Sequence, residues 1–444
     1  MTSIGRLVLR PLVLLGVLLV VSTASRAAWL GEPPTLVSDE IFYVNAARHI
    51  ASFPPGPGDI YAPRALGRDP NFEHPPLAKV IIAGSMKVLG NKSLAWRIPS
   101  VAFGTLAVGL VYWLARSVGA SGWTSLGAAA LMATDNMTLA YGRFATLDIF
   151  VVAFMILGVG LYLRDRPWLA GVALGVGACT KLIGLSALAV VGVMEVLRRA
   201  QRHRELKPVG AESPVARPAA ARTATSRLAA CGLAALVTYL GLLGVLDRTV
   251  TDFGDPVTHT RQMLNYAERT TFQMEEQSRG TWTQGTLAPV VRPWEWFLNR
   301  GQIGMYHKEG APPGQPGSER RLVLYEARMT PAILALALPA LLLAAWRSWS
   351  RADDGSNLAL AWCSAIFLLL VAVVLRGRIS YLYYVVILLP GVYIAIARMF
   401  SEAVLPSFRG ISPLRLSRAL AVAYTVVMAA SLVSLFPFRT WGGR

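Results

Sequence analysis

Two adjacent carboxylates and a lysine lie on one short stretch of the chain and could together transfer a group from a phosphate donor. Asp39 and Glu40 follow a first apolar segment at residues 7–30, and Lys79 ends the run His-Pro-Pro-Leu-Ala-Lys at residues 74–79. Carboxylates at the edge of a membrane are costly and usually mark function. A carboxylate can accept the proton of an attacking hydroxyl, and a fixed cation can stabilise a departing phosphate.

The same residues also admit a structural interpretation. Residues 39–50 carry apolar side chains at helical spacing, which predicts a helix along the membrane surface that is capped by Ser38 or Asp39. Acidic residues at a helix start complement the helix dipole, a Pro-Pro pair is common there, and Lys79 could simply snorkel. The occurrence of both groups on one loop favours the functional interpretation.

The composition sets the class of protein. The 444 residues are 54% hydrophobic and only 15% charged, and the mean hydropathy is +0.47. This predicts an all-α polytopic membrane protein. The formal charge of +18 lies between apolar segments without an aromatic-interleaved basic patch, so we expect no nucleic-acid partner but contacts with membrane lipids. Cys179, Cys231 and Cys363 fall inside apolar stretches and predict neither disulfides nor a metal site.

The apolar segments predict about eleven transmembrane helices and a single membrane domain over residues 1–444. The first is residues 7–30, which we expect to stay uncleaved although it ends in a sequence resembling a signal-peptidase site. Residues 76–90 are short and carry two lysines, which predicts an interfacial helix. The further spans are predicted at residues 96–115, 122–141, 147–163, 168–180, 182–197, 228–246, 330–346, 357–375, 380–397 and 419–436.

The basic segment at residues 198–227 sets the orientation. It holds eight Lys and Arg residues against two Glu, and the positive-inside rule places it in the cytoplasm. The first loop, residues 31–95, and the long segment 247–328 then lie outside, which predicts a multi-pass protein of the cell membrane with an extracytoplasmic active site. Residues 208–224 are rich in Ala, Arg and Pro and predict a disordered linker.

An ordered set of motifs resembles the protein O-mannosyltransferase family of the glycosyltransferase C superfamily. Each motif alone is weak, but together they cover most of the chain. They are Asp39-Glu40, the run at residues 74–79, Trp-Arg-Ile-Pro-Ser at 96–100, Asp135-Asn136, Arg-Phe-Ala-Thr-Leu-Asp at 143–148, Thr-Lys-Leu-Ile-Gly at 180–184, residues 261–266, Arg-Pro-Trp-Glu-Trp at 292–296 and the Tyr-rich run at 381–390.

The chain also departs from this family. Residues 247–328 are too few for the β-trefoil domain of eukaryotic members, and the Trp-x-Trp element at 294–296 lacks the His-Pro-Tyr run that often precedes it. The aminoarabinose transferases that modify lipid A share the superfamily and similar first-loop motifs. The acceptor therefore stays open between a secreted protein and a lipid or cell-wall glycan.

The resemblance implies transfer of a sugar, with mannose as the expected one, from a polyprenyl-phosphate donor to Ser or Thr hydroxyls of exported proteins, with inversion. Asp39 is the candidate base, and Glu40 would orient hydroxyl groups, although their roles could be exchanged because adjacent helical side chains diverge. No cofactor is expected with certainty, and a divalent cation stays possible. A transporter would predict repeated halves, and a non-catalytic partner would tolerate loss of the acid pair; neither pattern is seen.

The remaining candidates are cations for the donor phosphate and groups for the substrates. For each cation a structural role is the alternative: interfacial anchoring for Arg376 and Arg378, and a carboxylate partner for Arg143 or Lys181. The expected donor-phosphate residues are Lys79, Arg97, Arg143, Lys181, Arg376 and Arg378, and the expected substrate-binding residues are His74, Asp148, Trp294, Trp296 and Tyr383. We expect His74 to make helix-start hydrogen bonds rather than to ligate a metal, because no second ligand stands at a suitable spacing.

Overall fold

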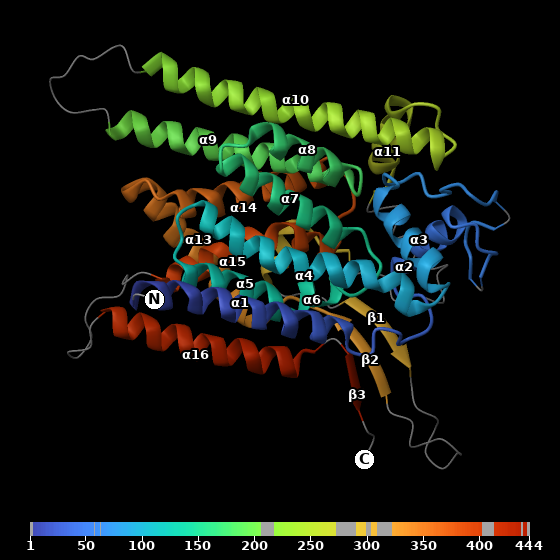
Figure 1. The fold of residues 1–444 in the computed structure, drawn as a ribbon, viewed down its shortest axis with the longest axis horizontal. Coiled ribbons are helices and arrows are strands. Elements are labelled where there is room, and N and C mark those ends of the chain that lie inside the picture. The colour runs from blue at the N-terminus through green and yellow to red at the C-terminus, as the bar shows by residue number, and fades with distance from the viewer. Residues whose placement is uncertain are drawn as a thin grey trace.

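The computed structural model consists of long helices that run side by side, with short helices and a small sheet gathered at one end (Figure 1). The structure describes residues 3–56, 58–62, 64–205, 217–271, 290–298, 303–308, 322–401, 413–436 and 438–441. The helices along the long axis are α1 (Ser3–Ala27), α4 (Ser93–Ser117), α5 (Gly122–Thr134), α7 (Asp148–Leu163), α8 (Pro167–Ala178), α9 (Ser186–Glu205), α10 (Arg217–Thr249), α13 (Pro331–Arg351), α14 (Asp354–Leu375), α15 (Val385–Ser401) and α16 (Pro413–Ser434).

Length and apolar composition make these helices suited to a membrane. Among the described residues, seven helices are long and apolar enough to cross one, and α7 and α8 are shorter apolar helices. Each predicted span overlaps one of the long-axis helices, although the count of eleven spans stays a prediction. The predicted span 122–141 is broken at Asp135, whose backbone is extended and whose carboxylate caps α6 (Asn136–Tyr141). The Asp135 carboxylate also accepts hydrogen bonds from the hydroxyls of Thr330 and Tyr393.

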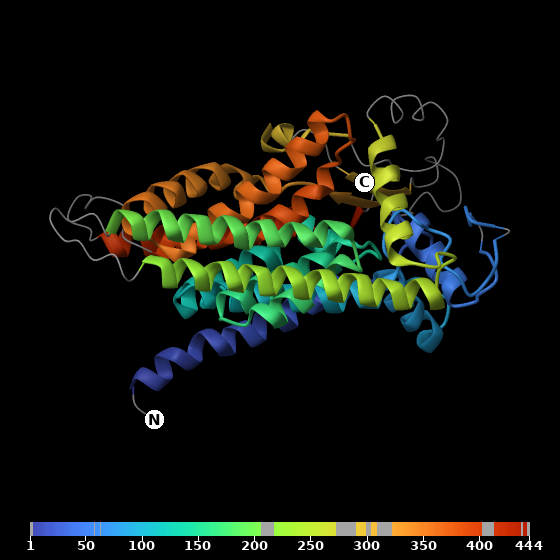
Figure 2. The ribbon, with the colours of Figure 1, turned by 90° about the horizontal axis from the view of Figure 1, so that it is seen from above.

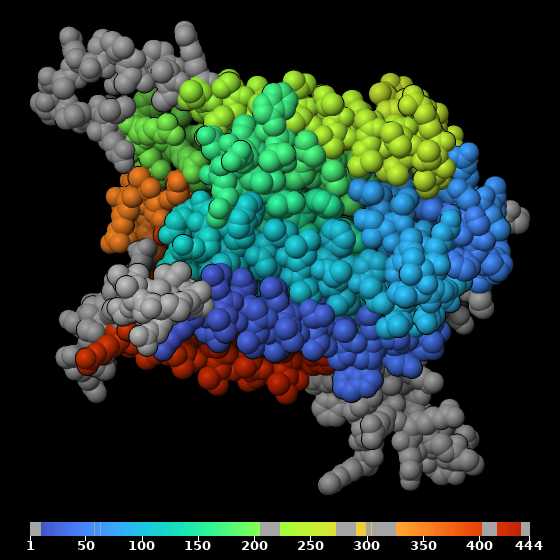
Figure 3. All heavy atoms as spheres, in the orientation of Figure 1, coloured from blue at the N-terminus to red at the C-terminus, as the bar shows by residue number. Residues whose placement is uncertain are grey.

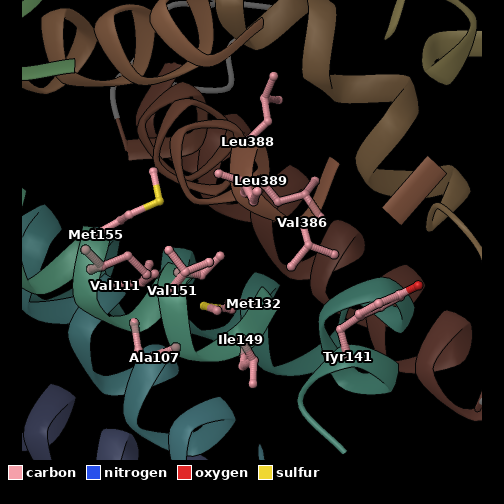
Figure 4. Close-up of a cluster of buried hydrophobic side chains, with 14 of the residues drawn as sticks. Ala107, Val111, Met132, Tyr141, Ile149, Val151, Met155, Val386, Leu388 and Leu389 are labelled. Carbon is pink, nitrogen blue, oxygen red and sulfur yellow. The ribbon is translucent and has the colours of Figure 1, made fainter. Parts of the chain in front are cut away.

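The core lies where α4, α5, α7 and α15 meet. Figure 4 shows Val111 of α4 and Val151 of α7 gathered below the α15 side chains, among them Leu389. Small residues allow this close approach: a Cβ at Gly158 would come within 2.4 Å of Leu174 on α8. This packing fixes the start of α7, which carries Asp148, and the start of α15, which directly follows Tyr383 and Tyr384.

The short elements gather at the end of the bundle opposite the first turns of α1 (Figure 2). They are α2 (Glu40–Ile50), α3 (Leu77–Leu89), α11 (Pro256–Arg269), the 3-10 helices η1 (Leu182–Leu185), η2 (Pro293–Leu298) and η3 (Leu382–Tyr384), and an antiparallel sheet of β1 (Ile303–Lys308), β2 (Leu322–Ala327) and β3 (Phe438–Trp441) in the order β1-β2-β3. Figure 3 shows the face built from α10, α8, α4 and α1, which α2 and α3 continue at this end.

Two sequence expectations need correction here, whereas a third agrees with the structure. The short helix predicted at residues 76–90 is present as α3, which is not among the candidate spans. Of the basic segment 198–227, α9 reaches Glu205 and α10 already begins at Arg217, so the expected disordered linker is wrong for residues 217–224. Residues 206–216 lie outside the described part. The sheet is a small addition to the expected all-α fold, and two of its strands fall in the segment 247–328.

Candidate active site

Asp39 stands at the start of α2 with its carboxylate available for chemistry. It occupies the N-cap position of α2 but makes no capping hydrogen bond, and its side chain is half-buried. The nearby Tyr383 hydroxyl favours the charged form of this carboxylate and lowers its pKa. Burial and, next, the negative charge of Asp148 raise the pKa of Asp39 to about 6. A carboxylate with such a pKa is ionised at neutral pH and is a stronger base than an exposed one.

Glu40, the neighbouring carboxylate, is a structural partner of Arg97. Both side chains are fully buried, and the Arg97 guanidinium donates to both Glu40 oxygens at 2.8 Å. Glu40 also accepts hydrogen bonds from the backbone N–H groups of Val37 and Ala145. Arg97 further binds the carbonyls of residues 30, 33 and 35. The pair therefore joins the first loop to α4 and to the segment before α7.

Lys79 holds the shape of the first loop. Its ammonium is buried, lies 2.6 Å from the Asp69 carboxylate, and donates to the carbonyls of Asn71 and His74 at 2.6 and 2.9 Å. Burial lowers the pKa of Lys79, and the Asp69 charge opposes this effect. With these oxygens around it, Lys79 faces the loop itself rather than an open phosphate site.

Asp148 and Lys181 form a buried ion pair beside Asp39. The Lys181 ammonium lies 2.7 Å from the Asp148 carboxylate at the start of α7, and 5.4 and 5.5 Å from the ring centroids of Tyr383 and Tyr384. The other Asp148 oxygen is buried and has no hydrogen-bond partner among the described residues. Lys181 thus has a carboxylate partner, as the structural alternative for this residue predicted. It also lines a cavity.

That cavity measures about 870 Å³ and has one polar end and a long apolar wall. The wall comes from α9, α10, α11, α14 and η1. The polar end is lined by Glu73, His74, Lys181, Arg261, Tyr266, Arg378 and Tyr384, and the apolar lining includes Leu182, Ile183, Leu185, Leu236, Leu240, Leu264, Leu369 and Val373. Asp39 does not line the cavity itself but lies near it, since the charges of Lys181 and Glu73, which do line it, act on Asp39.

The loop residues at the polar end are held by α11. Tyr266 of α11 lines the cavity beside Glu73 and lowers the pKa of its carboxyl, and Phe72 packs edge-on against the Tyr266 ring at 6.0 Å. The His74 ring lies 5.9 Å from the ring of Tyr43. Burial and, next, the positive charge of Lys181 hold the pKa of His74 well below its ordinary value. His74 is therefore neutral and can exchange hydrogen bonds without adding charge to the cavity.

The other predicted residues separate into those near the site and those away from it. Arg378 is half-buried in the cavity wall, whereas Arg376 is exposed and does not line it. Arg143 is buried and donates to the Trp29 carbonyl at 2.8 Å, which ties the segment before α7 to α1. Trp294 is 41% exposed, while Trp296 is buried and packs against Phe367. Neither tryptophan lines the large cavity.

Sequence reasoning missed several residues of this site. Glu73 immediately precedes the motif at residues 74–79, and Tyr384 immediately follows Tyr383, so adjacency to a motif was the available signal. Tyr141, whose ring stacks on Tyr383 at 5.3 Å, carried no such signal. Within the described ranges, no group of three His, Cys, Asp or Glu side chains could hold a metal ion.

Known mannosyltransferases are similar to this chain in sequence. Residues 73–207 match the family model described as dolichyl-phosphate-mannose-protein mannosyltransferase, a range that begins after Asp39. The polyprenol-phosphate-mannose–protein mannosyltransferase of Corynebacterium glutamicum is 24% identical over 376 residues, covering 74% of this chain and 70% of the relative. That of Mycobacterium tuberculosis is 21% identical over 418 residues, covering 83% and 77%.

Solved structures share the fold. The protein O-mannosyltransferase Pmt1-Pmt2 complex of S. cerevisiae, bound to the sugar donor, superposes with a TM-score of 0.69 at 11% identity, covering 96% of this chain and 90% of the other. ArnT from Cupriavidus metallidurans, bound to undecaprenyl phosphate, gives a TM-score of 0.51 at 17% identity, covering 97% and 71%. The chain therefore shares its overall fold with both of these solved structures.

Proposed function

We propose that this chain is a membrane glycosyltransferase that moves mannose from a polyprenyl phosphate to Ser or Thr hydroxyls of exported proteins. The proposal rests on one observation. Asp39, a carboxylate with a raised pKa that makes no capping hydrogen bond, lies near a cavity that has one polar end and a long apolar wall. Its resemblance in sequence to the mannosyltransferases of two bacteria supports the choice of sugar and acceptor.

The cavity suits a lipid-linked phosphate. Its leucine-rich wall between α9, α10 and α14 can shelter a polyprenyl chain, and the cations Lys181 and Arg378 at its polar end can balance a phosphate charge. Lys181 keeps one carboxylate, Asp148, while it faces the cavity, so the pair brings little net charge before the donor binds. Arg261 and Arg378, against the single carboxylate of Glu73, then supply the excess positive charge.

In the proposed reaction, Asp39 takes the proton of the acceptor hydroxyl. An acceptor hydroxyl attacks the anomeric carbon, its proton passes to the Asp39 carboxylate, and the bond between that carbon and the phosphate oxygen breaks. The polyprenyl phosphate leaves with the electron pair, and its charge faces Lys181 and Arg378. Attack from the side opposite the phosphate inverts the anomeric configuration. We place this chemistry at the extracytoplasmic face of the cell membrane, because the basic last turn of α9 and the start of α10 lie at the other end of the bundle (Figure 1).

Several predicted residues take supporting roles in this proposal. Glu40, Arg97, Lys79 and Arg143 hold the first loop and its neighbours in place instead of contacting the donor phosphate. His74 lines the polar end as a neutral substrate contact. Trp294 is an exposed aromatic outside the cavity, which suits an acceptor or membrane contact.

Reconstituted protein with labelled polyprenyl-phosphate-mannose and a Ser/Thr peptide tests the proposal. Labelled peptide whose product sugar has the inverted anomeric configuration is the expected result, and Asp39→Asn serves as the inactive control. Transfer to co-reconstituted membrane lipids or glycans but not to peptide would support the lipid or glycan acceptor instead. Donor binding without transfer to any acceptor would overturn the enzymatic proposal.

A further inference from the structure

The short helix α11 forms part of the wall of the large cavity. It contributes Arg261 to the polar end and Leu264 to the apolar lining, among other residues. The helix has only 14 residues, and isolated helices of about this length are marginal in water. Its place in the cavity wall therefore depends on contacts with the rest of the chain.

A buried hydrogen bond joins α11 to the end of α10. His259 Nδ1 lies 2.7 Å from Asp247 Oδ1, and both side chains are almost completely buried. An ionised carboxylate only accepts hydrogen bonds, so Nδ1 is the donor. The Phe253 ring stacks on the imidazole with centroids 4.1 Å apart, and His259 Nε2 has no hydrogen-bond partner among the described residues. The bond to Asp247 is thus the polar contact that fixes this side chain of α11.

Asp247 also holds the turn between α10 and α11, which in turn binds the first loop. The Asp247 carboxylate accepts a hydrogen bond from the Thr251 hydroxyl at 3.0 Å. The backbone N–H of Asp69 donates to the Val250 carbonyl at 2.7 Å, and the Arg68 guanidinium donates to the Thr251 carbonyl at 2.9 Å. The turn that Asp247 fixes is therefore attached to residues 68 and 69 of the first loop.

The first loop connects this turn to the polar end of the cavity. The Lys79 ammonium binds both the Asp69 carboxylate and the His74 carbonyl, which ties the two ends of the segment 69–74 together. Glu73 and His74 of this segment line the polar end. The α10–α11 turn thus links two parts of the cavity wall, α11 and the first loop.

We propose that Asp247 and His259 are positioning residues for binding of the lipid-phosphate donor. Neither lines the cavity, but their hydrogen bond holds α11 and the first loop where Arg261 and His74 can face one ligand. The precision of a binding site depends on such supporting contacts behind the residues that touch the ligand. The inference rests on the proposed function, because that proposal places the donor in this cavity.

Kinetics with varied donor and varied acceptor in reconstituted protein test this role. His259→Leu removes the hydrogen bond to Asp247 and keeps an apolar side chain in the space of the ring. We expect the donor KM, and the Kd for labelled polyprenyl phosphate alone, to rise about tenfold, because a displaced contact residue weakens binding. The acceptor KM and kcat at saturating donor should stay close to the wild-type values.

A conservative variant and a matched control separate positioning from loss of stability. His259→Asn presents an amide N–H near the position of Nδ1 and should restore most of the donor affinity. Gln201→Leu removes buried hydrogen bonds to Asn357 and Ser348 in the last turns of α9. It should lower thermal stability as His259→Leu does, yet leave the donor KM in place.

A second variant covers a failure of His259→Leu to fold. Asp247→Asn keeps an oxygen that can accept from His259 but removes its negative charge, which weakens the hydrogen bond. This variant should raise the donor KM less than His259→Leu, and in the same direction.

The outcomes distinguish this inference from the proposed function. Wild-type protein that binds polyprenyl phosphate but transfers no mannose would contradict the proposed function, and the Kd values of the variants would still test the positioning role. An unchanged donor KM and Kd in His259→Leu, or in Asp247→Asn where His259→Leu does not fold, would overturn the positioning role alone. An equal rise of donor and acceptor KM, or a similar rise of the donor KM in Gln201→Leu, would also overturn it.

Discussion

Asp39 and Glu40 are neighbours in the chain but lie in opposite surroundings. Glu40 is fully buried, and its two oxygens are bound by Arg97 and by two backbone N–H groups. Asp39 is half-buried and makes no capping hydrogen bond, and burial raises its pKa. Successive helical side chains point about 100° apart, so one enters the core and the other faces the cavity end. A pair of acids can thus hold one structural and one chemical residue.

The largest expected effect is on the chemical member of the pair. Asp39→Asn keeps the shape of the side chain but removes the base, so we expect transfer at saturating donor to fall by about 10²–10⁴-fold. Donor binding and thermal stability should change little, because Asp39 makes no cap. Turnover above half of the wild-type value would show that another group takes the proton.

For Glu40, the structural member of the pair, we expect loss of its partner to lower the free energy of unfolding. Arg97→Met leaves the Glu40 carboxylate buried without its cation, and breaking such a pair costs about 3–5 kcal/mol. Chemical unfolding in detergent measures this loss. Arg376→Met, at an exposed arginine, is the control and should stay within about 0.5 kcal/mol of wild type. Equal stability of the two variants would contradict the role of Glu40 as a structural partner.

Arg376 and Arg378, two residues apart in the chain, also differ in surroundings, and we expect a smaller effect there. Arg378 lines the cavity and Arg376 does not. A hydrogen bond to a charged group contributes about 1.5–3 kcal/mol, so Arg378→Gln should raise the donor KM about tenfold or more, while Arg376→Gln should leave it unchanged. Initial rates at varied donor concentration measure this. Equal KM values would remove Arg378 from the phosphate site.

The smallest effect concerns the apolar wall. Leu264 on α11 lines the cavity, and its side chain is 50% exposed, so Leu264→Trp should fill part of the lipid path without disturbing the core. We expect a several-fold higher KM for a long polyprenyl donor and a weaker effect for a short one. Leu420→Trp on α16, which lies outside the cavity lining, should affect neither donor. The same loss for both chain lengths would argue against a lipid path along α11.

Hydrophobicity predicted the helices well because each span is a local property of about twenty residues. The sheet was missed because β2 pairs with β3 more than a hundred residues later, and such pairing leaves no local pattern. The sequence also singled out the acid pair but could not tell Asp39 from Glu40. Their difference depends on Arg97, which lies 57 residues away, and on Tyr383 near the other end of the chain.

The pH dependence of transfer in wild type and in Asp39→Asn shows whether Asp39 is the base that takes the proton. The carboxylate must be deprotonated to accept a proton, and burial raises its pKa to about 6. Wild-type kcat/KM should therefore be constant above this pH and fall tenfold per unit below it. The residual activity of Asp39→Asn should lack this limb. A limb with the same midpoint in both proteins would contradict the account, because the titrating group would then be another residue.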